Sequence, residues 1–141
     1  MELLHVARVP PVTASPETTV LNAVQQMADA QVGAIVVTDS EKKVLGIFTE
    51  RDNMLRVTLK GLDPQQTHLS EVMTAPVATA SPDITPAEAL ARMIRSRLPI
   101  VDSSNRILGI VSVRQLLKRC VSEQEDSIEV LAAYVEAGGP G

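Results

Sequence analysis

Apolar residues follow two spacings along the first half of the chain, and each spacing predicts a different element. Between residues 20 and 27 they recur at i, i+3, i+4 and i+7, at Val20, Ala23, Val24 and Met27. This spacing places them on one face of a helix. Two short, almost wholly apolar runs follow at 34–37 and 44–48, with a polar turn at 39–43 between them. Such runs predict a hairpin whose strands are covered on both faces.

The same series of patterns occurs again in the second half of the chain. Ala14-Ser15-Pro16-Glu17 recurs as Ala80-Ser81-Pro82-Asp83, and Val44-Leu45-Gly46-Ile47 recurs as Ile107-Leu108-Gly109-Ile110. Agreement in order over so many positions indicates an internal duplication. Each copy is predicted to run strand, helix, strand, turn, strand, helix, so we expect an α+β fold made of two repeats.

The boundaries of the copies follow from this register. The first copy is placed at residues 8–60, a connecting loop and short helix at 61–73, the second copy at 74–121, and a C-terminal helix and tail at 122–141. A last helix is predicted over 127–137, because Ile128, Leu131 and Tyr134 or Val135 share one face.

The two copies differ in length at one place. From Met27 to Asp39 the first copy is three residues longer than the second copy is from Met93 to Asp102. Three residues are close to one helical turn, so the buried stripe can keep its phase. We expect the shortening in the connection between the helix and the next strand.

Composition narrows the function classes. Phe48 and Tyr134 are the only aromatic residues, so a flat ligand would be held between aliphatic side chains. Single-stranded nucleic acid is bound on aromatic platforms in a basic groove. Phosphodiester backbones in general require a net basic face, whereas the formal net charge here is −4. We therefore expect no nucleic-acid partner.

Seven of the 13 lysines and arginines lie between positions 92 and 119 in the second half of the chain. They are Arg92, Arg95, Arg97, Arg106, Arg114, Lys118 and Arg119, and none follows Arg119. Two interpretations remain open at this point. The set belongs to a solvated surface of mixed charge, or part of it faces a cleft that holds phosphate.

Residues for catalysis are scarce. His5 and His68 are the only histidines and Cys120 the only cysteine, so neither a zinc site nor a Cys–His pair is supported. Nucleophile-elbow, P-loop and GxGxxG patterns are missing as well. We expect a binding module rather than an enzyme, with no metal site and no obligatory cofactor.

The single cysteine fits a reducing compartment. No apolar run approaches the ~20 residues of a membrane span. A cytoplasmic protein without a membrane partner is therefore expected.

A further signal lies where the hairpin of each copy leads into its last helix. Thr49 and Asp52 form the pattern of a capping box, which needs no ligand. The functional alternative is a ribose clamp, because a carboxylate accepts hydrogen bonds from both sugar hydroxyls and a helix N-terminus favours phosphate. Ser112 and Gln115 repeat the pattern in the second copy.

In its context this motif resembles a known family. The run Gly46-Ile47-Phe48-Thr49-Glu50-Arg51-Asp52, preceded by a hairpin and duplicated once, is similar to the cystathionine-β-synthase (CBS) domain pair, also called a Bateman module. The resemblance extends from about Val12 to Lys118. The predicted C-terminal helix resembles the tail of small stand-alone bacterial members.

The resemblance implies β-α-β-β-α units, two of which pack with pseudo-two-fold symmetry and leave two clefts. It implies an adenosyl ligand, namely AMP, ADP, ATP, NAD(H) or S-adenosylmethionine, with magnesium accompanying polyphosphates in some members. Thr49 and Asp52 would then contact ribose and phosphate, and Arg51 is either a phosphate contact or an exposed residue of the first turn. The base-lining positions of the family map onto Val12, Thr13, Gly33, Ala34 and Ile35.

The second copy departs from the family pattern. Gln115 stands where the family has its ribose-binding aspartate, and an amide cannot offer a carboxylate to two hydroxyls. The three missing residues also fall where the base-lining connection is expected. We therefore predict one adenosyl site that depends on Asp52. A second, weaker site is assigned to Arg97, Ser112 and Arg114.

Apolar helix faces predict a homodimer, as CBS pairs commonly form disc-like dimers through their helices. Met54, Leu55, Leu116 and Leu117 are candidates for this interface or for the core of a single chain. The functional hypothesis is a regulatory module whose ligand changes the angle between the copies, which a protein partner reads in trans. The alternatives are a ligand-free structural dimer, a small enzyme acting on a nucleotide, and a role in transcription through direct DNA contact.

Overall fold

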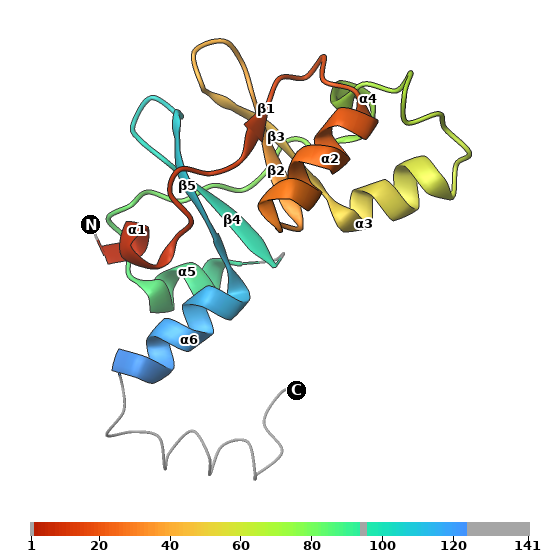
Figure 1. Ribbon diagram of the computed structural model, residues 1–141. Helices are drawn as coiled ribbons and strands as arrows, with labels where there is room; N and C mark the ends of the chain where they lie inside the picture. The colour runs from red at the N-terminus through yellow and green to blue at the C-terminus, as the bar shows by residue number, and fades with distance from the viewer. Residues whose placement is uncertain (1, 94–95, 124–141) are drawn as a thin grey trace, which may run out of the picture.

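The computed structural model describes residues 2–93 and 96–123 and shows two small sheets, each with its own helices (Figure 1). One sheet has the strand order β1-β2-β3 and the other the order β4-β5. The predicted hairpins are confirmed, since β2 pairs with β3 and β4 with β5, both antiparallel, while β1 runs parallel to β2. The strands are β1 (Thr13–Ala14), β2 (Ala34–Thr38), β3 (Val44–Thr49), β4 (Arg97–Val101) and β5 (Ile107–Ser112).

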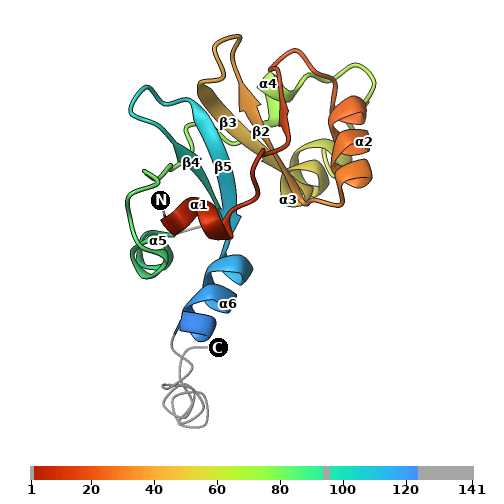
Figure 2. The same ribbon diagram turned by 60° about the vertical axis from the view of Figure 1, so that its left-hand side comes forward.

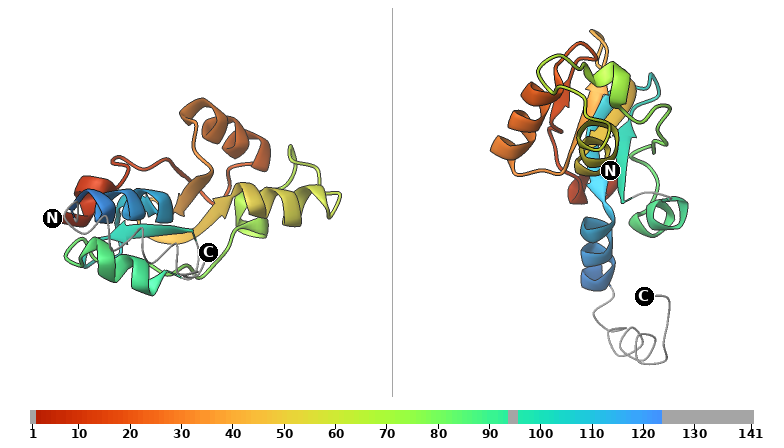
Figure 3. Two further views of the ribbon diagram at one scale, coloured as in Figure 1. Left: turned by 90° about the horizontal axis from the view of Figure 1, so that it is seen from below. Right: turned by 90° about the vertical axis from the view of Figure 1, so that its right-hand side faces the viewer.

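The helices alternate with the strands as predicted. They are α1 (Glu2–Val6), α2 (Val20–Ala30), α3 (Glu50–Asp52), which continues as the π-helix η1 (Asn53–Thr58), α4 (Leu69–Val72), α5 (Pro86–Arg92) and α6 (Val113–Glu123). In the second copy, α5 and α6 pack on each other at the end of the hairpin opposite its turn (Figures 1 and 3). Among the described residues, no helix has the length and apolar character needed to cross a bilayer. The helix predicted over 127–137 lies outside the described residues.

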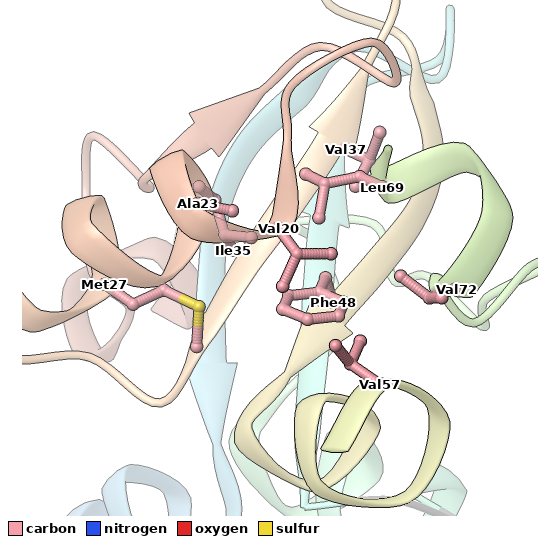
Figure 4. Packing of buried hydrophobic residues seen from close by; sticks show 9 residues of the cluster. All are labelled: Val20, Ala23, Met27, Ile35, Val37, Phe48, Val57, Leu69 and Val72. Atoms are coloured by element: carbon pink, nitrogen blue, oxygen red, sulfur yellow. The ribbon is translucent and has the colours of Figure 1, made fainter. Parts of the chain in front are cut away.

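The core of the first copy is a layer of aliphatic side chains around Phe48, which is fully buried (Figure 4). Helix α2 buries Val20, Ala23 and Met27, and Val24 packs partly buried against the same cluster. Every residue of β2 is buried, which confirms that this strand is covered on both faces. The second copy has a core of its own, built from Leu3, Ala80, Ala89, Leu98, Ile100, Val111 and Leu116.

The second copy differs from the prediction in two places. Helix α5 has 7 residues whereas α2 has 11, so the three missing residues shorten the helix itself and not only the connection behind it. The first strand of the copy is reduced to a single parallel bridge between Ala80 and Ile100. Strand β4 is nevertheless buried from Leu98 to Val101.

The segment before each copy packs against the other copy, which the repeat pattern alone did not predict. We call these segments leader 1 (residues 2–12) and leader 2 (residues 68–78). Helix α1 of leader 1 places Leu3 in the core of the second copy, and α4 of leader 2 places Leu69 in the core of the first. Figure 2 shows α1 beside β5 accordingly. His5 lies in α1, and His68 is exposed just before α4.

The leaders then add a short antiparallel bridge to the outer strand of each hairpin. Arg8 pairs with Ile110, and Thr74 pairs with Ile47. These positions are equivalent, because Arg8 and Thr74 each lie six residues before the alanines that start the repeat, Ala14 and Ala80. The two copies are thus joined by a reciprocal exchange of their leaders.

The two hairpin turns also contact each other symmetrically. The backbone N–H of Val44 donates to the carbonyl oxygen of Asn105 at 3.0 Å, and that of Ile107 donates to the carbonyl oxygen of Lys42 at 2.9 Å. Within the second turn, the backbone N–H groups of Arg106 and Ser104 donate to the Asp102 carboxylate. These hydrogen bonds hold the pKa of Asp102 below its ordinary value.

Each leader crosses its strand at a glycine, and the crossing is tighter at Gly46 than at Gly109. A Cβ atom built on Gly46 would lie 2.7 Å from the carbonyl oxygen of Thr74. One built on Gly109, the equivalent position, would lie 3.1 Å from the carbonyl oxygen of Arg8. The first distance is too short for any side chain, while the second requires only a small shift of the leader.

The substitution Gly46→Ala should therefore lower the free energy of unfolding by about 1–3 kcal/mol, because the new methyl group meets backbone that cannot move without breaking the Thr74–Ile47 bridge. Urea unfolding of Gly46→Ala, Gly109→Ala and the unchanged chain measures the effect. Gly109→Ala is the matched control and should cost less. Equal stability of all three proteins would show that the leader crossing tolerates a side chain at both positions.

Candidate functional site

The capping box predicted at the end of β3 is present. The hydroxyl of Thr49 accepts a hydrogen bond from the backbone N–H of Asp52 at 3.1 Å. In return, Oδ2 of Asp52 accepts from the backbone N–H of Thr49 at 3.0 Å and from its hydroxyl at 3.2 Å. This arrangement satisfies two N–H groups that the start of a helix would otherwise leave without a partner.

The second carboxylate oxygen of Asp52 is also engaged within the chain. Thr74 of leader 2 donates its hydroxyl to Oδ1 of Asp52 at 3.1 Å, in a buried hydrogen bond. Nε of Arg56 lies 3.8 Å from the same oxygen, and Nη1 of Arg56 donates to the carbonyl oxygen of Met73 at 2.8 Å. Asp52 is consequently only 7% exposed, and its carboxylate ties the end of β3 to leader 2.

The equivalent box in the second copy is made by an amide. Oε1 of Gln115 accepts from the backbone N–H of Ser112 at 2.8 Å, and the backbone N–H of Gln115 donates to the Ser112 hydroxyl at 3.1 Å. Both residues are half-buried rather than buried. In the first copy the hydroxyl of Thr74 donates to the carboxylate of the box. The equivalent residue in the second copy is Arg8, which is exposed.

Two clefts lie between the copies, and each takes its walls from both of them. Cleft A has a volume of about 430 Å³ and is lined by Arg8, Val12, Gln31, Val32, Gly33, Ala34, Arg97, Ile110, Val111, Ser112 and Gln115. Cleft B has a volume of about 330 Å³ and is lined by Ile47, Thr49, Glu50, Arg51, Val77, Ser96 and Arg97. Both volumes fall in the range of small-molecule sites.

The clefts are related by the internal symmetry of the chain. Cleft A joins the capping box of the second copy to the start of β2 in the first copy, whereas cleft B joins Thr49 of the first copy to the start of β4 in the second. Arg97 lines both clefts. A Cβ atom built on Gly33 would collide with Nη2 of Arg97 and would lie 3.0 Å from Oε1 of Glu50. The guanidinium of Arg97 therefore packs directly against Gly33.

The structure brings some of the predicted site residues together and separates others. Val12, Gly33 and Ala34 share cleft A with Arg97 and Ser112, which had been assigned to the weaker second site. Thr49 and Arg51 line cleft B instead. The two groups are still neighbours along the sheet, since Ala34 is the register partner of Thr49 and the backbone N–H of Glu50 donates to the carbonyl oxygen of Gly33 at 3.0 Å.

Four predicted residues line neither cleft. Ile35 is fully buried in the core of the first copy, and Asp52 is buried behind Thr49. Thr13 and Arg114 are exposed outside both clefts. The base-lining and ribose-binding positions that the family resemblance assigned to one site are therefore distributed over two clefts, and their roles stay predictions.

Some cleft residues were not predicted from the sequence, namely Arg8 and Gln31 in cleft A, and Val77 and Ser96 in cleft B. A signal for Arg8 and Val77 was available, because both belong to leaders at fixed distances before Ala14 and Ala80. The sequence could not show that each leader crosses to the other copy. Among the residues that the structure describes, no group of three or more histidine, cysteine, aspartate or glutamate side chains could hold a metal ion.

Comparison with known proteins identifies the repeats. The family model of the CBS domain matches twice, at residues 4–52 and 69–122. An uncharacterized protein of Methanopyrus kandleri is 32% identical over 117 residues, which cover 81% of this chain and 60% of that protein. Inosine-5'-monophosphate dehydrogenase of Methanocaldococcus jannaschii is 37% identical over 111 residues, which cover 77% of this chain and 21% of the enzyme. The chain thus spans less than two thirds of these relatives.

Solved structures share the fold. A protein with CBS domains from Burkholderia ambifaria superposes with a TM-score of 0.76 at 27% identity, over 88% of this chain and 96% of that one. Two more distant structures carry ligands. They are CBSX2 in complex with AMP, with a TM-score of 0.72 at 16% identity, and the CBS domain pair of protein MJ0100 in complex with 5'-methylthioadenosine and S-adenosyl-L-methionine, with a TM-score of 0.71 at 23% identity.

The repeats found in the sequence, the two symmetry-related clefts between them and the double match of the family model agree with one another. The chain therefore belongs to the CBS domain family and carries two CBS domains that form a CBS pair.

Proposed function

We propose that this CBS pair is a regulatory module that binds an adenosyl ligand between its two domains. The observation that carries the proposal is cleft A, because it combines an aliphatic wall from both copies with two guanidinium groups. CBS pairs of the same fold have been crystallised with AMP and with S-adenosyl-L-methionine. The ligand class for this chain is accordingly AMP, ADP, ATP, NAD(H) or S-adenosylmethionine, with magnesium accompanying a polyphosphate.

The wall of cleft A suits a base without aromatic stacking. Val12, Val32 and Ala34 come from the first copy, and Ile110 and Val111 from the second, so a flat purine would lie between aliphatic side chains of both domains. Burial of its two faces contributes through the hydrophobic effect. Arg8 and Arg97 lie at the same cleft, where their charge attracts phosphate.

Cleft B is the second candidate for the same ligand class. The hydroxyl of Thr49 and the guanidinium of Arg51 line it, together with Arg97 and the carboxylate of Glu50. Asp52 supports this cleft from behind, since it holds Thr49 in place through the capping box. In this proposal Asp52 is a positioning residue rather than a direct ribose contact.

A ligand between the domains provides a physical route to regulation. Each cleft takes its walls from both copies, so a ligand that fits one relative arrangement better than another shifts the population toward it. We propose that a separate protein reads this change in trans. A homodimer is part of the proposal, with Met54 (51% exposed), Leu55 (38%) and Leu117 (51%) at the interface. Leu116 is fully buried in the core of the second copy.

One observation favours a second function, a dimerisation module that senses no nucleotide. The carboxylate of Asp52 is fully engaged by Thr49, Thr74 and Arg56, so it needs no ligand to be satisfied. The two proposals differ in one measurable property, which is whether any adenosyl compound stabilises the folded chain.

Binding of an adenosyl ligand should raise the melting temperature of the protein, because a ligand that binds only the folded state stabilises it by mass action. Thermal-shift and calorimetric titrations with AMP, ADP, ATP, NAD(H) and S-adenosylmethionine test this. The variant Arg97→Ala should weaken the binding of AMP by about tenfold or more, because Arg97 lines both clefts. Arg92→Ala is the matched control, since Arg92 is exposed outside both clefts. If no compound shifts the melting temperature, the ligand-free module is the correct function.

The variant Asp52→Ala should lower the free energy of unfolding by about 1–3 kcal/mol, because it removes the capping box and leaves the buried hydroxyl of Thr74 without its acceptor. Gln115→Ala, which removes the equivalent cap at a half-buried position, should cost about 1 kcal/mol or less. Urea unfolding compares the two variants. Loss of AMP binding in Asp52→Ala at unchanged stability would contradict the positioning role and assign Asp52 to the ligand directly.

A further inference from the structure

The internal symmetry of the chain allows the two capping boxes to be compared position by position. In the first copy Asp52 and Thr74 meet in a buried hydrogen bond. In the second copy the equivalent residues are Gln115 and Arg8, and both line cleft A. The first copy thus has a carboxylate that accepts from a buried hydroxyl. The second copy has at the same places two side chains with N–H donors, and both of them line a cleft.

The hydrogen bonds of Gln115 determine which end of its amide is available. The backbone N–H of Ser112 donates to Oε1 of Gln115 at 2.8 Å. Because only the oxygen can accept from an N–H group, the Nε2 atom is the free end of the amide. It has no hydrogen-bond partner among residues 2–93 and 96–123 and is not a buried unsatisfied atom, so it reaches the solvent of the cleft. The amide therefore presents two N–H donors, where a carboxylate would present acceptors.

The charged side chains that line cleft A are arginines, and the nearest carboxylate described beside them is that of Glu50, which meets Arg97 at Gly33. Arg8 and Arg97 line cleft A, and no aspartate or glutamate of the described chain does. Neither arginine forms an ion pair with a described residue, and the one side-chain bond of Arg97 is a long contact of 3.4 Å to the hydroxyl of Ser96. In cleft B, by contrast, Glu50 accompanies Arg51 and Arg97. Cleft A combines two guanidinium groups with an amide donor, a set that matches the acceptor oxygens of a phosphate.

We infer that cleft A binds an oxyanion beside Gln115, whose counterpart in the first copy is the carboxylate of Asp52, and that the cleft therefore selects a 5'-phosphorylated nucleoside without recognising the ribose diol. The inference rests on the proposed function and deepens it. A carboxylate recognises a diol because it accepts from both hydroxyls, and cleft A has no charged acceptor among its described residues for that purpose. Arg8, Arg97 and Gln115 hold the phosphate, and the aliphatic wall holds the base.

Calorimetric titration of the full chain with 5'-AMP, 2'-deoxy-5'-AMP, adenosine and inorganic phosphate tests the inference. The two monophosphates should bind with dissociation constants within about threefold of each other, because the 2'-hydroxyl has no charged acceptor. Adenosine should bind about tenfold or more weakly, since it lacks the group that makes charge-assisted hydrogen bonds. Inorganic phosphate should also bind more weakly than 5'-AMP, because it leaves the aliphatic wall unoccupied.

Variants link these preferences to cleft A. Arg8→Ala should weaken 5'-AMP by about tenfold and leave adenosine unchanged, whereas Arg92→Ala, at an exposed position outside both clefts, should change neither. Gln115→Asp restores a carboxylate beside the Ser112 hydroxyl, so it should weaken 5'-AMP and make 5'-AMP bind better than its 2'-deoxy form. Thermal unfolding of each variant verifies that it is folded.

Two results would overturn the inference while the adenosyl proposal stands. One is a preference of the unchanged chain for 5'-AMP over 2'-deoxy-5'-AMP of tenfold or more, which would show that the diol is recognised. The other is 5'-AMP binding that Arg8→Ala leaves unchanged, which would place the phosphate elsewhere. Failure of every adenosyl compound to bind would instead remove the proposed function itself.

Discussion

Thr74 and Ile47 exchange two backbone hydrogen bonds of 2.8 and 3.0 Å, and Arg8 and Ile110 exchange two of 2.9 and 3.3 Å. Through these bridges each leader joins the hairpin of the other copy, and the helix before it completes the other core with Leu69 or Leu3. Neither hydrophobic cluster is complete without the exchanged segment. The duplication is therefore one cooperative unit rather than two domains on a linker.

The same crossing decides what lies beside each capping box. Leader 2 brings a threonine to Asp52, and the two close on each other in a buried hydrogen bond. Leader 1 brings Arg8 to the equivalent place beside Gln115, and the space between them stays open as part of cleft A. A buried hydroxyl and carboxylate satisfy each other, whereas a guanidinium and the N–H end of an amide are both donors. The chemical difference between the clefts follows from these two pairs of residues.

The proposed regulation by a ligand depends on this architecture as well. Each cleft is walled by the hairpin end of one copy and the strand start of the other, so its shape changes whenever the copies move relative to each other. Arg97 lines both clefts, which connects the two sites through one side chain. The hairpin turns, joined through Asn105 and Lys42, hold the opposite end of the pair together. A relative movement of the copies is thus expected to open or close the clefts about that end.

The sequence by itself determined the hairpins, the aliphatic core and both capping boxes, because each depends on residues at most a few positions apart. It also determined the duplication, because the same local patterns occur twice in the same order. Of the four apolar positions predicted for one face of α2, Val20, Ala23 and Met27 are buried and Val24 is partly buried, and the Thr49–Asp52 box is present as predicted. Only the tertiary structure decided which residues face a common cleft. The resemblance grouped Thr49 and Asp52 with Val12 and Gly33, but the crossing of the leaders places Val12 and Gly33 opposite Ser112 and buries Asp52 under Thr74. That crossing is a contact between residues far apart in the chain, made possible by the close approach at Gly46 and Gly109, and no periodicity in the sequence reports which copy a leader will join.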